Sequence, residues 1–287
     1  MPQTINTNLA SLNAQRNLNG SQMSLATSMQ RLSSGLRVNS AKDDAAGLAI
    51  AERMNAQSKG MTAAIRNAND GISMAQVAEG ALGKATDLLQ RMRELTVQAA
   101  NGTNTDADRT SLDQEFGELA KEIQRVVSGT SFNGKKIVGA DAGTTTFQIG
   151  ANTTAGEDTI DVAFTNMTAD ASITTIAGTD VSGTGRVTIG DSTVNFQAVI
   201  DDIDGALDKI NSERAVLGAT QSRFEAIISN LQIGVENQSA ARSRIMDADF
   251  AAETANLSRA QVLQQAGNAM VAQANQLPQQ VLSLLKG

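Results

Sequence analysis

Apolar residues at the two ends of the chain recur with the spacing of an α-helix that packs lengthwise on another helix. Near the C-terminus they return every seven positions, and an interleaved set of small or apolar residues keeps the same interval. Alternating steps of three and four residues place both sets on one side of a helix. Residues 1–36 show a comparable pattern. The apolar positions that we expect to pack between helices are Ile5, Leu9, Leu12, Leu18, Leu25, Leu32, Leu263, Met270, Leu277 and Leu284.

The polar positions of these terminal segments carry few charges. Among the first thirty residues only Arg16 is charged, and from Ala260 to the end only Lys286 is charged. A helix surface that faces bulk water normally carries Lys and Glu. We therefore expect the two ends of the chain to pair with each other and with copies from neighbouring molecules. The alternative is an ordinary helical bundle whose ends happen to meet.

Helical periodicity covers three further stretches between the termini. Ser40 to Asp44 interrupts the first pattern with helix-capping side chains, and a second helix is predicted to run to about Ala100. After the turn-forming residues 101–106, a third helix is predicted to end at Ser128-Gly129. The period returns from Ile200 and breaks again near residues 247–256.

Residues 144–193 have a different character, because they are rich in Thr, Gly, Ala and Asp. Apolar residues alternate with polar ones at Phe147 and Ile149 and again at 160–164, which predicts one β-hairpin. Apolar residues at 187–189 and 194–196 flank a Gly-Asp turn and predict a second hairpin. We expect this segment to be exposed.

These patterns predict a mainly α fold: an elongated, up-and-back helical hairpin or coiled-coil bundle with a small β-hairpin region in the middle of the chain. The prediction has three parts. Residues 1–42 and 250–287 form the terminal coiled-coil helices, residues 43–143 and 198–249 form a helical middle bundle, and residues 144–197 form the exposed hairpin segment.

Composition excludes several classes of function. The net charge is −7, whereas a nucleic-acid binder normally carries a basic patch. The chain has no Cys and no His, so thiol nucleophiles, His bases and the usual zinc sites are excluded. No apolar run approaches the ~18 residues of a membrane span, and the N-terminus lacks the pattern of a cleavable signal peptide.

The acidic cluster of Asp201, Asp202, Asp204, Asp208 and Glu213 raises the question of a cation site. Asp202-Ile203-Asp204-Gly205 lacks the ligand spacing of a calcium loop, and carboxylates are typical of the start of a helix. We therefore expect no enzyme activity, no metal, no cofactor and no partnership with nucleic acid or membranes.

Long stretches of the chain resemble bacterial flagellin, the subunit of the flagellar filament. INTNLASLNAQRNL (5–18), RLSSGLRVNSAKDDAAGLAIAERM (31–54) and LQRMRELTVQAANGTN (89–104) are similar to its N-terminal region. LGATQSRFEAIISNL (217–231) and the sequence from 243 to 285 are similar to its C-terminal region. About 60 residues separate the two matching parts, so the outer domains of larger flagellins are absent or reduced to one or two hairpins.

The resemblance implies a structural role in swimming motility. The terminal helices of flagellins form an inner tube and the middle bundle an outer tube of an extracellular helical homopolymer. Subunits leave the cell through the flagellar type III export apparatus, without a cleaved signal peptide. The implied partners are other copies of the chain, an export chaperone, the filament cap protein and the hook–filament junction protein.

The resemblance also implies recognition by a host innate immune receptor, the Toll-like flagellin receptor. Arg91, Leu95 and Glu115 match that family's contact positions.

Two alternatives remain open at this stage. One is a hook–filament junction protein of the same family, which would make few copies rather than long filaments. The other is a secreted helical translocator that inserts in host membranes, which would need a long apolar helical hairpin.

Overall fold

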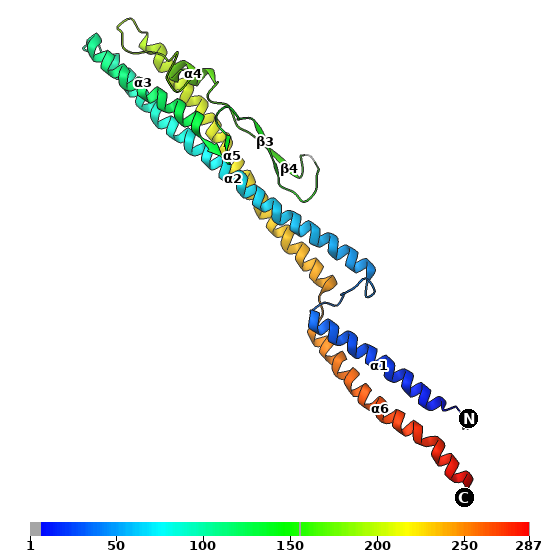
Figure 1. The fold of residues 1–287 in the computed structure, drawn as a ribbon. Coiled ribbons are helices and arrows are strands. Elements are labelled where there is room, and N and C mark those ends of the chain that lie inside the picture. The colour runs from blue at the N-terminus through cyan, green and yellow to red at the C-terminus, as the bar shows by residue number, and fades with distance from the viewer. Residues whose placement is uncertain (1–6, 155, 287) are drawn as a thin grey trace. The chain divides into compact units, whose positions relative to one another are not determined.

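The computed structural model describes residues 7–154 and 156–286, and the side chains of residues 277–286 lie outside the description. Within these ranges the chain forms six helices and two small antiparallel hairpins (Figure 1). The chain divides into two compact units, one of residues 1–56 with 236–287 and the other of residues 57–235. We call them the terminal unit and the central unit. The mainly α fold with a small hairpin region is confirmed.

The order of the helices follows the predicted periodicity. The helices are α1 (Leu9–Ser34), α2 (Ala45–Ala99), α3 (Asp106–Gly129), α4 (Ala171–Ala177), α5 (Phe196–Met246) and α6 (Phe250–Lys286). The predicted interruption at 40–44 is confirmed, and Asp44 caps α2 by accepting a hydrogen bond from the Gly47 N–H at 2.8 Å. The second interruption covers only residues 247–249, because Asp249 caps α6 and the helix resumes earlier than expected.

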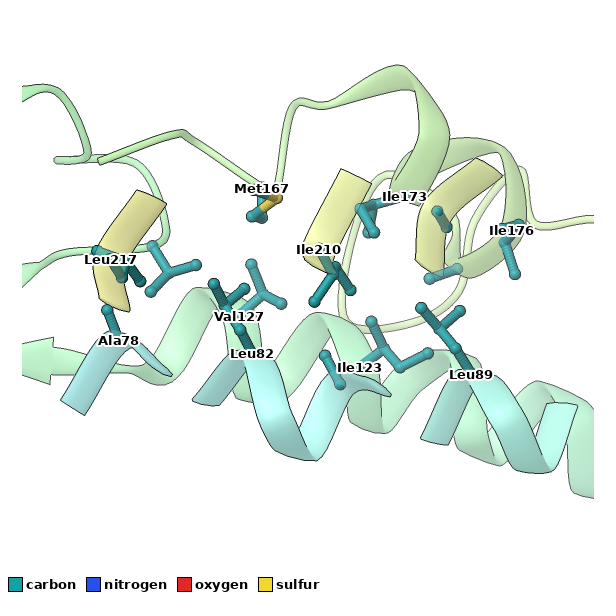
Figure 2. Packing of buried hydrophobic residues seen from close by; sticks show 14 of the residues in the cluster. Ala78, Leu82, Leu89, Ile123, Val127, Met167, Ile173, Ile176, Ile210 and Leu217 are labelled. Atoms are coloured by element: carbon teal, nitrogen blue, oxygen red, sulfur yellow. The ribbon is translucent and has the colours of Figure 1, made fainter. Parts of the chain in front are cut away.

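The central unit is built around a continuous apolar core. Figure 2 shows side chains from α2, α3, α4 and α5 that point toward one another. Leu82 and Ile123 meet there with Ile210, and all three are at most 2 % exposed. Thr105 starts α3 with a reciprocal capping box, in which its hydroxyl accepts from the Asp108 N–H and the Asp108 carboxylate accepts from the Thr105 N–H.

The first predicted hairpin is confirmed and the second is wrong. Strands β3 (Thr144–Gln148) and β4 (Thr159–Ala163) pair antiparallel, with Phe147 opposite Ile160. Residues 187–189 form no strand, and Phe196 is the first residue of α5. The helical period from Ile200 onward prevails over the local alternation at 194–196. The other hairpin consists of β1 (Ser131–Phe132) and β2 (Lys135–Lys136), joined by Asn133-Gly134, and both of these turn residues have positive φ.

The segment 144–197 is only partly exposed, which corrects the expectation drawn from its polar composition. Eight of its apolar residues are at most 6 % exposed and belong to the central core; they are Ile160, Val162, Phe164, Met167, Ile173, Ile176, Ala177 and Ile189. The segment also makes polar contacts with the helices, because the Asn67 Nδ2 on α2 donates to the Gln148 carbonyl at 2.9 Å. Apolar and polar contacts together hold the segment on the bundle.

Candidate functional site

Helices α1 and α6 lie side by side and antiparallel in the terminal unit (Figure 1). At one end, the Asn8 Nδ2 donates to the Ala274 carbonyl at 2.7 Å, and the Ser11 hydroxyl donates to Asn275 Oδ1 at 2.7 Å. Near the other end, Arg31 lies 3.9 Å from the Glu253 carboxylate. Short uncharged side chains therefore supply most of the polar contacts that fix the register of the pair.

Small residues on α6 form the line of closest approach to α1. Ala260 and Ala274 are 3 % and 7 % exposed, although Ala has little side chain to bury. At Gly267, halfway between them, an added Cβ would lie 3.1 Å from Leu18 Cδ1, so this position has little room for any side chain. The interleaved small set predicted from the sequence is thus the set that packs inside the pair.

The ten terminal apolar positions divide into two groups in the structure. Leu18, Leu25 and Leu32 are partly buried on the side of α1 that contacts α6. Four others are 48–69 % exposed, namely Leu9, Leu12, Leu263 and Met270. Ile5 lies outside the described residues, and the side chains of Leu277 and Leu284 lie outside them as well. Pairing within one chain therefore leaves a substantial part of the predicted apolar surface uncovered.

The exposed apolar residues of α1 include a second face of that helix. Leu12 and Met23 are eleven residues apart, which is close to three full turns, so both lie on one side with Leu9. This side points away from the side that carries Leu18 and Leu25, and Met23 is 69 % exposed. The sequence pattern did not separate these two faces, because steps of three and four residues connect both sets.

A groove runs along the junction of α1 and α6. It is lined from α1 by Ala10, Asn13, Ala14, Asn17, Leu18 and Ser21, and from α6 by Leu263, Ala266, Gly267 and Met270. None of these ten side chains is charged. Its chemistry suits a helix with an apolar and uncharged surface better than a charged small molecule.

The connections at the inner ends of α1 and α6 are also ordered. The Arg37 N–H donates to the Met246 carbonyl at 2.6 Å, and the Ala248 N–H donates to the Gly35 carbonyl at 2.9 Å. Val38 and Met246 bury themselves in a small cluster with Ala51. These contacts fix the point at which α1 ends and α6 begins, so the two helices are held as a pair by more than their own surfaces.

The three residues matched to receptor contacts lie in the central unit and do not share one environment. Arg91 and Glu115 are about half exposed, and the Arg91 Nη2 lies 2.8 Å from Glu115 Oε1. Hydrogen bonds from Arg91 to Glu115 and Glu94 raise the pKa of the Arg91 guanidinium. Leu95, by contrast, is 1 % exposed and belongs to the core.

Leu95 therefore packs inside this folded unit, and its contact with the receptor stays a prediction. A residue four positions from Arg91 is rotated by about 40° around the helix, and here that rotation moves Leu95 from the surface into the core. Arg91 and Glu115 stay together on the surface, while Leu95 stabilises the bundle beneath them.

One partly buried ion pair in the central unit is not predicted by the sequence. Arg186 Nη2 lies 2.6 Å from Asp113 Oδ2, and Asp113 Oδ1 also accepts from the Ile189 N–H at 2.8 Å. Burial raises the pKa of Asp113, but the hydrogen bonds from Arg186 and Ile189 outweigh it and leave the pKa below its usual value. The pair fastens the segment after α4 to α3. Its partners are 73 residues apart, so no local signal could have revealed it.

Within residues 7–154 and 156–286, no three His, Cys, Asp or Glu side chains lie together in a way that could hold a metal ion. A separate finding is that none of the helices, over their described residues, is long and apolar enough to cross a membrane.

Two protein-family models match most of the chain. The family model described as "Bacterial flagellin N-terminal helical region" matches residues 5–141, and the model "Bacterial flagellin C-terminal helical region" matches residues 200–285. The unmatched stretch between them contains β3, β4 and α4.

Individual relatives extend the match to nearly the whole chain. The flagellin of Halalkalibacterium halodurans is 45 % identical over 282 residues, covering 98 % of this chain and 99 % of the relative. Flagellin D of Vibrio anguillarum is 37 % identical, with coverages of 99 % and 100 %. A crystal structure of Bacillus cereus flagellin aligns with a TM-score of 0.49 and 29 % identity, over 58 % of this chain and 88 % of that one. The chain belongs to the bacterial flagellin family.

Proposed function

We propose that this chain is the structural subunit that polymerises into the flagellar filament used for swimming, and that α1 and α6 provide contacts between copies. Flagellins are a family of structural proteins that form an extracellular homopolymer. One observation carries the proposal for these particular helices. Leu9, Leu12, Leu263 and Met270 are 48–69 % exposed along helices that carry few charges. A soluble helix pair would normally expose charged residues in their place.

Polymerisation of purified protein tests the proposal directly. Monomer would be added to short filament seeds, and filament length would be followed by electron microscopy. Growth of long filaments from this protein alone supports a filament subunit. Failure to extend the seeds, or addition of only a few copies at the tip, would contradict it and would favour the hook–filament junction role.

We also propose that α6 is held by an export chaperone before assembly. Before export, the exposed side chains of Leu263 and Met270 need a binding partner, because exposed apolar helix surfaces promote aggregation. Export through the flagellar type III apparatus, addition under the cap protein and growth from the junction protein complete the proposed route. Removal of residues 250–287 should abolish chaperone binding in a pull-down and leave the central unit folded by circular dichroism. Chaperone binding by the truncated chain would refute this part.

We propose further that Arg91 and Glu115 form a contact for the Toll-like flagellin receptor of a host. Support comes from their exposure and from the surface that their ion pair creates across α2 and α3. Replacement of both residues, Arg91→Ala with Glu115→Ala, should weaken receptor signalling by monomer. Lys121→Ala with Glu118→Ala removes a comparable exposed pair on α3 and serves as the matched control. Equal signalling by both double variants would contradict the proposal.

A further inference from the structure

The methionines of this chain are its only side chains that mild oxidants attack readily. The sequence has ten Met and no Cys, Trp, Tyr or His. A thioether takes up one oxygen atom and becomes a polar, chiral sulfoxide, and the rate of this reaction follows solvent exposure. The position of each methionine therefore decides where an oxidant acts on the molecule.

The described methionines fall into clearly different environments. Met74, Met92, Met167 and Met246 are 0–6 % exposed, and the first three are in the central core. Met54 and Met61 on α2 are partly buried. Met23, Met29 and Met270 are 69 %, 57 % and 63 % exposed. Met1 lies outside the described residues.

All three exposed methionines lie on the terminal pair of helices. Met270 lines the groove between α1 and α6, beside Leu263. Met23 shares the second apolar face of α1 with Leu12, and Met29 lies one helical turn after Leu25 and is 57 % exposed. An oxidant would thus modify the assembly helices and spare the central core.

We propose that Met23, Met29 and Met270 are oxidation sites of the free subunit, and that sulfoxide formation there blocks addition to the filament. With hydrogen peroxide, the thioether sulfur attacks the O–O bond, gains one oxygen and loses two electrons. The other peroxide oxygen leaves as water, so thioether and peroxide give sulfoxide and water. The inference rests on the proposed assembly function of α1 and α6.

The block follows from the polarity of the product. A sulfoxide oxygen that is buried between helices without a hydrogen-bond donor loses its contact with water and gains nothing in exchange. The groove around Met270 is lined mainly by Ala, Leu and Gly, with Asn13, Asn17 and Ser21 as its polar members. Since contacts between copies would cover these sulfurs, oxidation before assembly should be damaging, whereas the same oxidant should act slowly on finished filaments.

The test compares peroxide-treated and untreated monomer. Peptide mapping by mass spectrometry should show sulfoxide at Met23, Met29 and Met270 forming about tenfold faster than at the four buried methionines. Treated monomer should need an about tenfold higher concentration to extend seeds. Equal oxidation rates at exposed and buried methionines, or equal extension by treated and untreated monomer, would overturn the inference.

Methionine-to-leucine variants identify which methionines are responsible for the loss of seed extension after oxidation. A triple variant, Met23→Leu, Met29→Leu and Met270→Leu, keeps the apolar surface and should extend seeds after peroxide treatment as well as before it. Met54→Leu with Met61→Leu is the matched control and should lose extension after treatment, as the natural chain does. Loss of extension by the treated triple variant would place the sensitive group elsewhere and refute the assignment.

Two further outcomes separate the inference from the proposed function. If untreated natural monomer fails to extend seeds, the proposed function fails. If the triple variant does not assemble even before treatment, a repair experiment replaces it. Oxidised natural monomer is treated with methionine sulfoxide reductases A and B, and seed extension is measured again. Recovery of seed extension after repair supports the inference. If mass spectrometry shows that the sulfoxides have been reduced but seed extension does not recover, the inference is overturned.

Discussion

The central and terminal units differ in how far they bury the apolar faces of their helices. In the part of the chain whose side chains are described, all of the largest fully buried residues lie in the central unit, among them Phe116, Phe224 and Ile203. Among the described side chains of the terminal unit, the buried hydrophobic ones are Val38, Ala51, Met246, Ala260 and Ala274. The central unit completes its core with its own segments, whereas the terminal unit keeps large apolar side chains at its surface.

The two units also differ in the number of ion pairs on their surfaces. Over the described residues, Arg31 and Glu253 form the one ion pair of the terminal unit. The central unit displays several exposed pairs, including Arg93 with Asp204 at 2.7 Å and Lys121 with Glu118 at 2.8 Å. A charged surface is suited to water, and a neutral one can be buried with little desolvation cost. This contrast supports the proposal that other copies cover the terminal unit.

The largest expected effect comes from placing a charge on the terminal surface. Met270→Glu should abolish seed extension, because burying an unpaired carboxylate in each subunit costs several kcal/mol. The central unit should keep its unfolding transition in urea. Val181→Glu, at a position that is 56 % exposed in the central unit, is the control and should extend seeds normally. Normal assembly by Met270→Glu would show that this surface stays uncovered in the filament.

The next effect concerns the stability of the terminal helices in the free subunit. A pair of helices with few large buried side chains should open locally, so its amides should exchange at least about a thousandfold faster than those around Phe224. Hydrogen exchange of monomer, read by mass spectrometry, measures the ratio, and the same measurement on filaments should show both regions protected. Equal protection in the monomer would mean that α1 and α6 are stable without partners.

A substitution in the core of the central unit tests how much stability that unit gains from its own packing. Phe224 packs edge-on against Phe147, with ring centroids 5.5 Å apart, and a Cβ added at Gly71 would lie 2.6 Å from Phe224 Cζ. Phe224→Ala should lower the free energy of unfolding of the central unit by about 3–5 kcal/mol. Urea denaturation of the monomer measures it, and Phe250→Ala, which removes a 57 % exposed ring in the terminal unit, is the control. A loss below 1 kcal/mol would contradict the packing described here.

The smallest expected effect is the pH dependence of the Asp113–Arg186 pair. Asp113→Asn should destabilise the central unit by about 1–3 kcal/mol at neutral pH, because it weakens the hydrogen bonds to Arg186. The pKa of Asp113 lies below its usual 3.8, so the stabilisation is complete above that value and disappears as pH falls through the lower folded pKa. Urea midpoints of the natural chain and the variant should converge in acid. A difference that stays constant down to pH ~2 would show that the carboxylate charge is unimportant.

Local sequence signals were sufficient for most helices and for one hairpin. The periodicity predicted α1, α2, α3, α5 and α6, and capping residues such as Asp44 marked their starts. Two local signals differ from the observed strands. The alternation at 187–196 predicts a hairpin that does not form, whereas Asn133-Gly134, a strong turn dipeptide, joins the short strands β1 and β2. Helix α4 was missed because seven residues provide too few turns for a periodic pattern.

What the sequence determined by itself is which residues belong to an apolar helix face and that the ends of the chain carry few charges. Both follow from the 3.6-residue period and from composition, which are local properties. Only the tertiary structure decided what covers each face. It buries Leu95 and leaves Arg91 exposed one turn away, and it places Leu18 against α6 but leaves Leu12 and Met270 uncovered. A periodic pattern records that a face is apolar and says nothing about its neighbour, because burial depends on segments that lie far apart in the sequence.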